Sequence, residues 1–246
     1  MISSIDSSWL RGLLWAVSAA CAVLLALGPA PVKAQSELRE DFASLKRWRP
    51  LFFDNIDAHS TYSIEHNASS SWLRGVADNS ASALVSTEHF NPYEFPHLSW
   101  RWKVSNVYQK GDATSKSGDD YPLRVYVLFE YDPSTASGWQ KIKYGLAKAV
   151  YGDYPPDSTL NYIWANQPHD ARVLINAYTD RARMIPLRQG TRDVGKWVDE
   201  SVHIIEDYRE AFGESPPANA TLAVMSDADN TGERAIGFID YLRLSP

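Results

Sequence analysis

The residues best suited to chemistry lie near the C-terminus, in a polar loop between two apolar runs. The loop carries Asp227, Asp229 and Asn230, and Asp240 follows within the second run. That run alternates, and Asp240 shares its apolar side with residues such as Phe238, so the pattern predicts a carboxylate on the buried face of a strand. A buried carboxylate is costly unless a cation or several hydrogen-bond donors meet it. Oxygen ligands at this spacing favour calcium; the alternative is an Asx-rich hairpin whose side chains cap their own backbone.

A second acidic pair, Asp119 and Asp120, comes just before the longest predicted strand, residues 122–130. If this strand pairs antiparallel with a strand over 220–225, the acidic pair and the C-terminal loop lie at the same edge of a sheet. Like charges that close require a cation or protonation, so the sequence predicts a metal site there. The alternative is that Asp119 and Asp120 are solvated loop acids. The residues predicted to ligate the ion are Asp119, Asp120, Asp227, Asp229, Asn230 and Asp240.

A third constellation consists of aromatic and arginine side chains on the predicted strands. Arg124 and Tyr126 lie on the face of strand 122–130 that is opposite its apolar side, and Tyr162 and Trp164 share a face of another strand. Aromatic faces flanked by Arg, Asp and Asn are suited to sugar rings, and arginines on an open face can pair with a carboxylate such as uronate. The alternative is that the rings fill the core, since 12% of the residues are aromatic. The predicted ligand-binding residues are Arg124, Tyr126, Tyr162, Trp164, Tyr178 and Arg181.

Catalytic signatures are mostly missing from the sequence. It contains no Gly-x-Ser-x-Gly, His-Glu-x-x-His, phosphate-binding loop or Gly-x-Gly-x-x-Gly motif, and its six histidines lack ligand spacing. No strand carries the Glu-x-Asp-x-x-Glu pattern that would supply the carboxylate pair of a glucanase. The tyrosines and arginines just named imitate part of a polysaccharide lyase site, but no alternating histidine joins them.

Short alternating runs predict the strands that must position these residues. The clearest is 97–104, where large apolar residues alternate with Ser, Arg and Lys. Further strands are predicted over 50–53, 61–64, 72–77, 83–85, 122–130, 160–164, 172–178, 182–187, 220–225 and 235–244. A short helix is predicted over 138–151, and 196–213 is interpreted as a strand to about Ile205 followed by a helix that Gly213 closes. Many short strands without a βαβ rhythm predict an all-β, jelly-roll β-sandwich with one or two short helices.

Residues 1–34 have the pattern of a secretory signal peptide and are excluded from the fold. Their apolar core, 13–27, is too short to span a bilayer comfortably, and a small-x-small cleavage site follows it. We therefore expect a periplasmic or secreted protein with one β-sandwich domain over 35–246. The net charge of −6 and the lack of a basic stripe argue against a nucleic-acid partner. No later run is long or apolar enough for a membrane span.

Four segments, 118–129, 160–164, 207–213 and 224–232, together resemble an exported bacterial family catalogued as domain of unknown function 3047. The likeness spans about residues 41–246, and it implies no established activity, so no catalytic residue follows from it. A weaker, fold-level likeness is to galactose-binding and other carbohydrate-binding jelly rolls. In these, a Lys-Trp strand, a short helix ending in Phe-Gly and a terminal Phe-Ile-Asp-x-Leu-x-Leu strand recur, often beside a structural calcium. Segments 195–197, 212–213 and 238–244 match that order.

These observations favour an exported, non-catalytic protein that binds a glycan or a cell-envelope saccharide, with a structural calcium as its cofactor. One alternative is a polysaccharide lyase or hydrolase on the same jelly-roll scaffold. Another is a structural envelope protein that binds other proteins through a sheet edge. Fold does not imply function, and the sequence leaves the ligand unnamed and the question of catalysis open.

Overall fold

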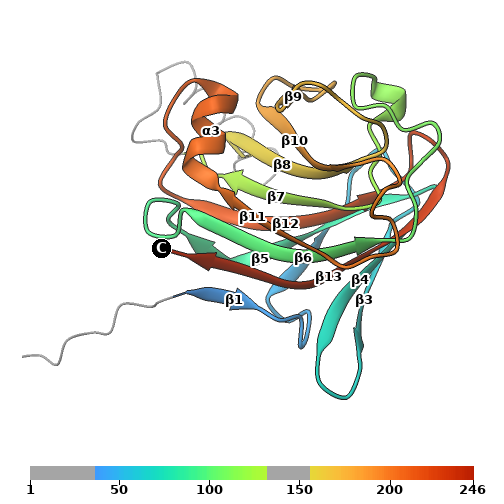
Figure 1. Cartoon of the computed structure of the whole chain (residues 1–246), viewed down its shortest axis with the longest axis horizontal. Coiled ribbons are helices and arrows are strands. Elements are labelled where there is room, and N and C mark those ends of the chain that lie inside the picture. The colour runs from blue at the N-terminus through green and yellow to red at the C-terminus, as the bar shows by residue number, and fades with distance from the viewer. Residues whose placement is uncertain (1–36, 132–155) are drawn as a thin grey trace, which may run out of the picture. The chain divides into compact units, whose positions relative to one another are not determined.

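Two β-sheets face each other across one core in the computed structural model, which describes residues 37–131 and 156–246 (Figure 1). The first sheet has the order β11 (Val198–His203), β6 (His97–Val104), β13 (Arg234–Ser245), β4 (Ser71–Asp78) and β3 (Thr61–His66), with β1 (Leu38–Glu40) also paired to β13. The second has the order β2 (Trp48–Leu51), β5 (Ala81–Phe90), β12 (Ala220–Asp227), β7 (Arg124–Phe129), β8 (Ser158–Ala165), β10 (Ala182–Gln189) and β9 (Leu174–Ile175). The predicted all-β jelly-roll sandwich is confirmed. The signal segment predicted for 1–34 and the helix predicted for 138–151 lie outside the described residues.

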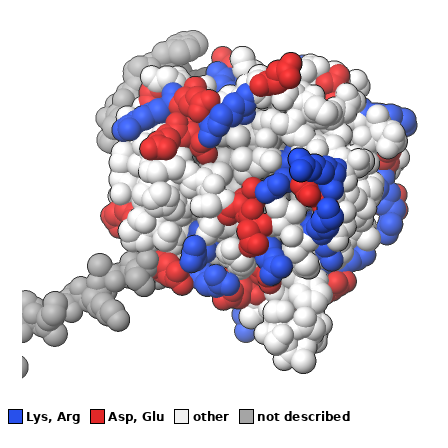
Figure 2. Space-filling view, in the orientation of Figure 1, with Lys and Arg blue, Asp and Glu red and all other residues white. Residues whose placement is uncertain are grey.

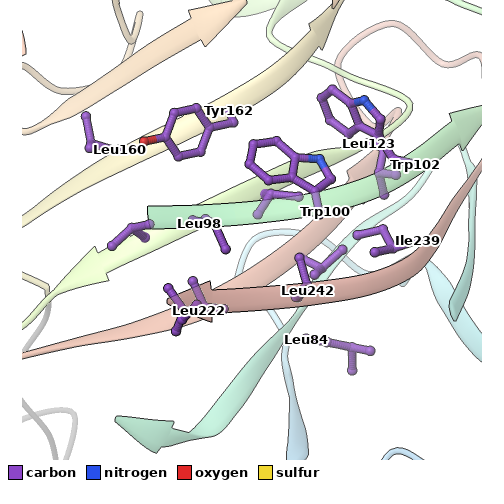
Figure 3. Packing of buried hydrophobic residues seen from close by; sticks show 14 of the residues in the cluster. Leu84, Leu98, Trp100, Trp102, Leu123, Leu160, Tyr162, Leu222, Ile239 and Leu242 are labelled. Carbon is purple, nitrogen blue, oxygen red and sulfur yellow. The ribbon is translucent and has the colours of Figure 1, made fainter. Parts of the chain in front are cut away.

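Strict alternation along the central strands produces the core. On β6, Trp100 and Trp102 are fully buried, and the odd-numbered residues of β7, such as Val125 and Val127, meet them from the second sheet. Figure 3 shows Trp100 and Trp102 among other core side chains, such as Tyr162. Successive side chains of a strand point to opposite faces. A residue that points into this core is therefore followed by one that points to the outer face.

The segment 196–213 switches from strand to helix as predicted. β11 ends at His203, whose side chain accepts a hydrogen bond from the backbone N–H of Glu206 and so caps α3 (Ile204–Phe212). Gly213 ends the helix with a φ of 73°, a left-handed conformation that glycine adopts without a Cβ clash. Figure 1 shows α3 at one end of the second sheet, where Tyr208 packs edge-on against Phe129 with ring centroids 4.6 Å apart.

The predicted strand over 172–178 is mostly wrong, because only Leu174–Ile175 forms a strand. The side-chain oxygen of Asn176 accepts a hydrogen bond from the backbone N–H of Tyr178 at 3.0 Å, and this local turn competes with a ladder. After the turn, β10 pairs antiparallel with β9 and parallel with β8. The turn therefore carries Asn176 and Tyr178 over the outer face of the second sheet.

Charged side chains are mixed on the face seen in Figure 2, where Lys and Arg lie among Asp and Glu beside broad uncharged areas. Among the described residues, no helix has both the length and the apolar character needed to cross a membrane. A short 3-10 helix, η1 (Lys116–Gly118), precedes the acidic pair that leads into β7.

Candidate functional site

A cavity of about 810 Å³ opens on the outer face of the second sheet. Its floor comes from β7, β8, β10 and β12, and its walls come from loops before and after those strands. The lining residues are Phe52, Phe53, Asp54, Asn55, Ile56, Asp119, Arg124, Tyr126, Asn161, Asn176, Tyr178, Ala182, Met225, Asp227, Asp229 and Asn230. Small-molecule sites typically have a volume of about 300–1,000 Å³. A second cavity, between β1 and β5, has about 40 Å³ and holds water at most.

The alternation of β7 explains why Arg124 and Tyr126 face this cavity. Val125 and Val127 belong to the core, so the even-numbered side chains between them point the other way. The same rule holds on β8, where Asn161 lines the cavity between two core residues. The hydrophobic core thus determines which polar residues are presented at the site.

A buried ion pair forms the deepest part of the floor. Arg124 Nε donates a hydrogen bond to Asp227 Oδ1 at 2.9 Å, and one of its terminal nitrogens is ion-paired with the second oxygen of the same carboxylate. Another hydrogen bond runs from Arg124 to the backbone oxygen of Asp119 at 2.7 Å, and the Asp119 carboxylate lies 3.6 Å from the guanidinium. The guanidinium also lies over the ring of Tyr121 at 4.4 Å. Arg124 is therefore already occupied by partners from its own chain.

Asp227, the acidic member of this pair, also lies close to two further aspartates, as the predicted strand pairing required. β7 and β12 are antiparallel, with Arg124 opposite Met225, and this register brings Asp120, Asp227 and Asp229 together with ligand atoms within 4.8 Å of one another. Burial, followed by the charge of Asp120, raises the pKa of Asp229. The three carboxylates form a group that can hold a metal ion.

The other predicted metal ligands surround this group or lie away from it. Asn230 is adjacent, because its side-chain nitrogen donates to Asp120 at 3.1 Å, and the backbone N–H of Thr231 donates to the same carboxylate at 2.6 Å. Asp119 lines the cavity, but its Oδ2 accepts a hydrogen bond from Asn176 at 2.9 Å. Neither residue belongs to the group of three carboxylates.

Asp240 requires a correction, because it is not on the buried side of β13. The register with β6 shifts between Ile239 and Tyr241, so Asp240 is the extra residue of a β-bulge. The bulge changes the phase of the strand, and Asp240 faces outward, 3.7 Å from Arg101 and with 27% of its side chain exposed. A strictly alternating pattern cannot reveal such an insertion. Asp240 contributes nothing to the acidic group.

The predicted aromatic site also separates into two sets. Arg124, Tyr126 and Tyr178 line the cavity. By contrast, Tyr162 and Trp164 are fully buried between the sheets, with centroids 5.4 Å from Trp100 and 5.5 Å from Trp102, respectively. Figure 3 shows the ring of Tyr162 among the core side chains. The prediction that these two rings contact a ligand is wrong, because they share a face with the core residue Leu160.

Arg181 likewise lies outside the set of residues that line the cavity. Its guanidinium is ion-paired with Asp157 and Glu214 and lies 5.3 Å from the ring centroid of Phe212. The residue secures the end of β10 against α3 and the loop that follows it. Its predicted role in binding an acidic ligand is therefore unsupported by its position.

Several residues that line the cavity are absent from the ligand-binding set predicted from the sequence. The apolar run over 50–53 predicts a strand that includes Phe52 and Phe53, yet β2 ends at Leu51 and both residues line the cavity. The available signal was the run of three apolar residues before Asp54, because a half-buried strand cannot bury all three. Asn161 also carried a signal, since it is an amide in the middle of an apolar strand.

A comparison with known protein families confirms the family that the sequence resembles. A family model described as "Protein of unknown function (DUF3047)" matches residues 46–243. No curated protein matches the sequence.

Solved structures with a similar fold include a family 11 carbohydrate-binding module from Clostridium thermocellum, at 10% identity and a TM-score of 0.41, covering 86% of this chain and 96% of that one. A family 12 xyloglucanase from Bacillus licheniformis has 10% identity and a TM-score of 0.44, covering 86% and 99%. Lectin I-B4 from Griffonia simplicifolia, in a metal-free form, has 9% identity and a TM-score of 0.38, covering 86% and 99%. Scores this low transfer neither a site nor an activity.

Proposed function

This chain belongs to the DUF3047 family of proteins of unknown function, and on that premise we propose that it is an exported, non-catalytic protein that binds a glycan or a cell-envelope saccharide. The observation that carries the proposal is the cavity of about 810 Å³, which combines exposed aromatic rings at its mouth with a buried polar floor. Sugar rings have an apolar face and a polar rim, and a cavity of this composition complements both.

The aromatic rings at the mouth are held in place before any ligand binds. The hydroxyl of Tyr178 is hydrogen-bonded to Asn230 Oδ1 at 2.8 Å and to the backbone oxygen of Lys116 at 3.1 Å, yet 56% of the residue is exposed. Phe52 is 52% exposed and stacks on His59 with centroids 4.3 Å apart. Large rings exposed in a monomer mark interaction sites when they border a cavity, and little ordering entropy is lost when they are already positioned.

Export and a structural calcium are the finer parts of the proposal. Export is supported by the signal-peptide pattern of residues 1–34. Calcium is supported by the hard oxygen ligands of Asp120, Asp227 and Asp229, which lie within 4.8 Å of one another. An ion there would connect the loop after β12 to the start of β7 and so stabilise one wall of the cavity.

Binding of the mature protein to immobilised glycans and to isolated cell-envelope polysaccharide tests the proposal. We expect Phe52→Ala and Tyr178→Ala each to weaken binding roughly three- to tenfold, because each removes a stacking surface. Tyr93→Ala is the matched control, since Tyr93 is 45% exposed but does not line the cavity. Loss of binding in all three variants, or in none, would contradict the proposed site.

Two further outcomes would contradict the proposal as a whole. Release of cleaved or unsaturated products from the bound polysaccharide would assign a hydrolase or lyase activity instead. Copurification with an envelope protein, without affinity for any glycan, would indicate a structural role. Each result is distinct from glycan binding without product release, which is the expected result.

A further inference from the structure

We infer that the cavity selects a neutral, hydroxyl-rich saccharide and excludes saccharides that carry carboxylate or sulfate groups. This inference rests on the proposed function and specifies its ligand class. It follows from the chemistry of the cavity floor, where two acceptor atoms lack a hydrogen-bond partner and the guanidinium contributed by the described residues is paired with Asp227.

The first observation is Asn161, which is 1% exposed and lines the cavity from the outer face of β8. Its side-chain oxygen has no hydrogen-bond partner among the residues that the structure describes. A buried amide oxygen without a partner is costly, and the cost is removed when a ligand donates to it. The floor therefore presents an acceptor to the ligand.

Asp119 supplies a second acceptor at the same floor. It is 5% exposed, and its Oδ1 accepts no hydrogen bond from the described part of the chain, although the Arg124 guanidinium lies 3.6 Å away. Asn161 Oδ1 thus requires a donor and Asp119 Oδ1 can accept one, and the hydroxyl groups of a sugar are donors. A carboxylate or sulfate group brings only further acceptors.

The charge of the lining leads to the same conclusion. Among the described residues, four aspartates and one arginine line the cavity, so the formal charge of this lining is negative. Arg124 could form the two parallel hydrogen bonds of a bidentate carboxylate contact only by giving up its bonds to Asp227, which is 0% exposed and would then be a buried carboxylate without its cation. These partners therefore argue against the pairing of this arginine with a uronate that the sequence suggested.

A glycan array that spans neutral, amino, carboxylated and sulfated saccharides tests the inference, with the mature wild-type protein applied in calcium and again in chelator. We expect neutral saccharides to bind under both conditions and acidic ones to bind at least tenfold more weakly. Binding that is strongest to carboxylated or sulfated saccharides, in either buffer, would overturn the ligand class while leaving the proposed function intact. Failure to bind any glycan would overturn both.

Variants of two neighbouring residues on β8 test the floor directly. Asn161→Leu removes the free acceptor, and we expect it to weaken binding to the best neutral saccharide by roughly tenfold. Thr159→Val is the matched control: it removes a buried hydroxyl that also has no partner among the described residues, and Thr159 does not line the cavity. Equal affinity of Asn161→Leu and the wild type, with the fold verified by its melting curve, would remove Asn161 from the site.

Asp54→Lys tests the exclusion of acidic saccharides by charge. The substitution should not disturb the core, because Asp54 is an exposed residue of the loop at the cavity mouth. We expect the new cation to increase affinity for acidic saccharides at low salt and to leave affinity for the neutral one within about twofold. Acidic saccharides that bind this variant no better than the wild type would contradict exclusion by charge.

Discussion

The two faces of the second sheet differ in how completely their side chains are packed and hydrogen-bonded. The inner face packs against β6 and β13 with aromatic and aliphatic side chains, and Trp164 and Tyr162 are fully enclosed there. The outer face carries a cavity of about 810 Å³ and acceptors, such as Asn161 Oδ1, without partners in the described residues. The same strands supply both faces, so the core and the cavity are lined by alternate residues of one sequence.

Residue type alone does not separate core residues from residues that line the cavity. Trp164 and Tyr178 are both aromatic, and both were predicted to bind a ligand, but one is 0% exposed and the other is 56% exposed. Arg124 is charged and yet 4% exposed. Substitutions on the two faces should therefore separate loss of folding stability from loss of binding.

The largest expected effect comes from the inner face. Trp164→Ala removes a buried indole against Trp102 and should lower the free energy of unfolding by about 3–5 kcal/mol. Tyr178→Ala, on the outer face, should change it by about 0.5 kcal/mol or less. Chemical denaturation followed by intrinsic fluorescence measures both values. Similar losses of unfolding free energy in the two variants would contradict the conclusion that only the inner face contributes strongly to stability.

The next effect comes from the ion pair under the cavity. Arg124→Met should destabilise the protein by about 3 kcal/mol, because it leaves the buried carboxylate of Asp227 without its cation. The double variant with Asp227→Asn should recover much of that loss, since it removes the uncompensated charge. A double-mutant cycle on unfolding free energies gives the coupling. Additive losses would indicate that the pair contributes no more than packing.

The smallest expected change in stability comes from calcium binding to the group formed by Asp120, Asp227 and Asp229. Calcium at ten times its dissociation constant should stabilise the wild type by about 1.4 kcal/mol, which corresponds to a melting temperature about 3–6 °C higher. Asp229→Asn should reduce this rise and Asp240→Ala should keep it, since only Asp229 belongs to the group. The rise should also shrink as the pH falls through the raised pKa of Asp229, because the protonated carboxyl cannot ligate the ion. Melting curves that are identical in calcium and in chelator would exclude the ion.

Much of the secondary structure could be predicted from the sequence because it depends on local periodicity. The strand over 97–104 and the switch to a helix ended by Gly213 were both predicted correctly. The strand over 172–178 failed because the side chain of Asn176 forms a turn, a hydrogen bond that apolar periodicity does not encode. Asp240 failed for a related reason, since one inserted residue reverses the side of every residue after it.

The candidate site was only partly predictable. The meeting of Asp120, Asp227 and Asp229 followed from one assumed strand pairing, and that pairing is present. Phe52 and Asn161 could not be assigned to the same site, because they are 161 − 52 = 109 positions apart in the sequence and only the fold brings them to one cavity. Pocket walls formed by distant loops depend on long-range contacts that no local pattern specifies.

In a strand without a bulge, such as β8, the alternation in the sequence shows which residues share a face. Which of the two faces is covered depends on the fold. On β8 the alternation separates Tyr162 from Asn161, but it is the packing of Trp100 against Tyr162 that buries one and leaves the other to line the cavity. A period of two sorts the side chains of a strand into two faces without showing which face is buried. Burial requires residues that pack against one of these faces, and here those residues come from the opposite sheet.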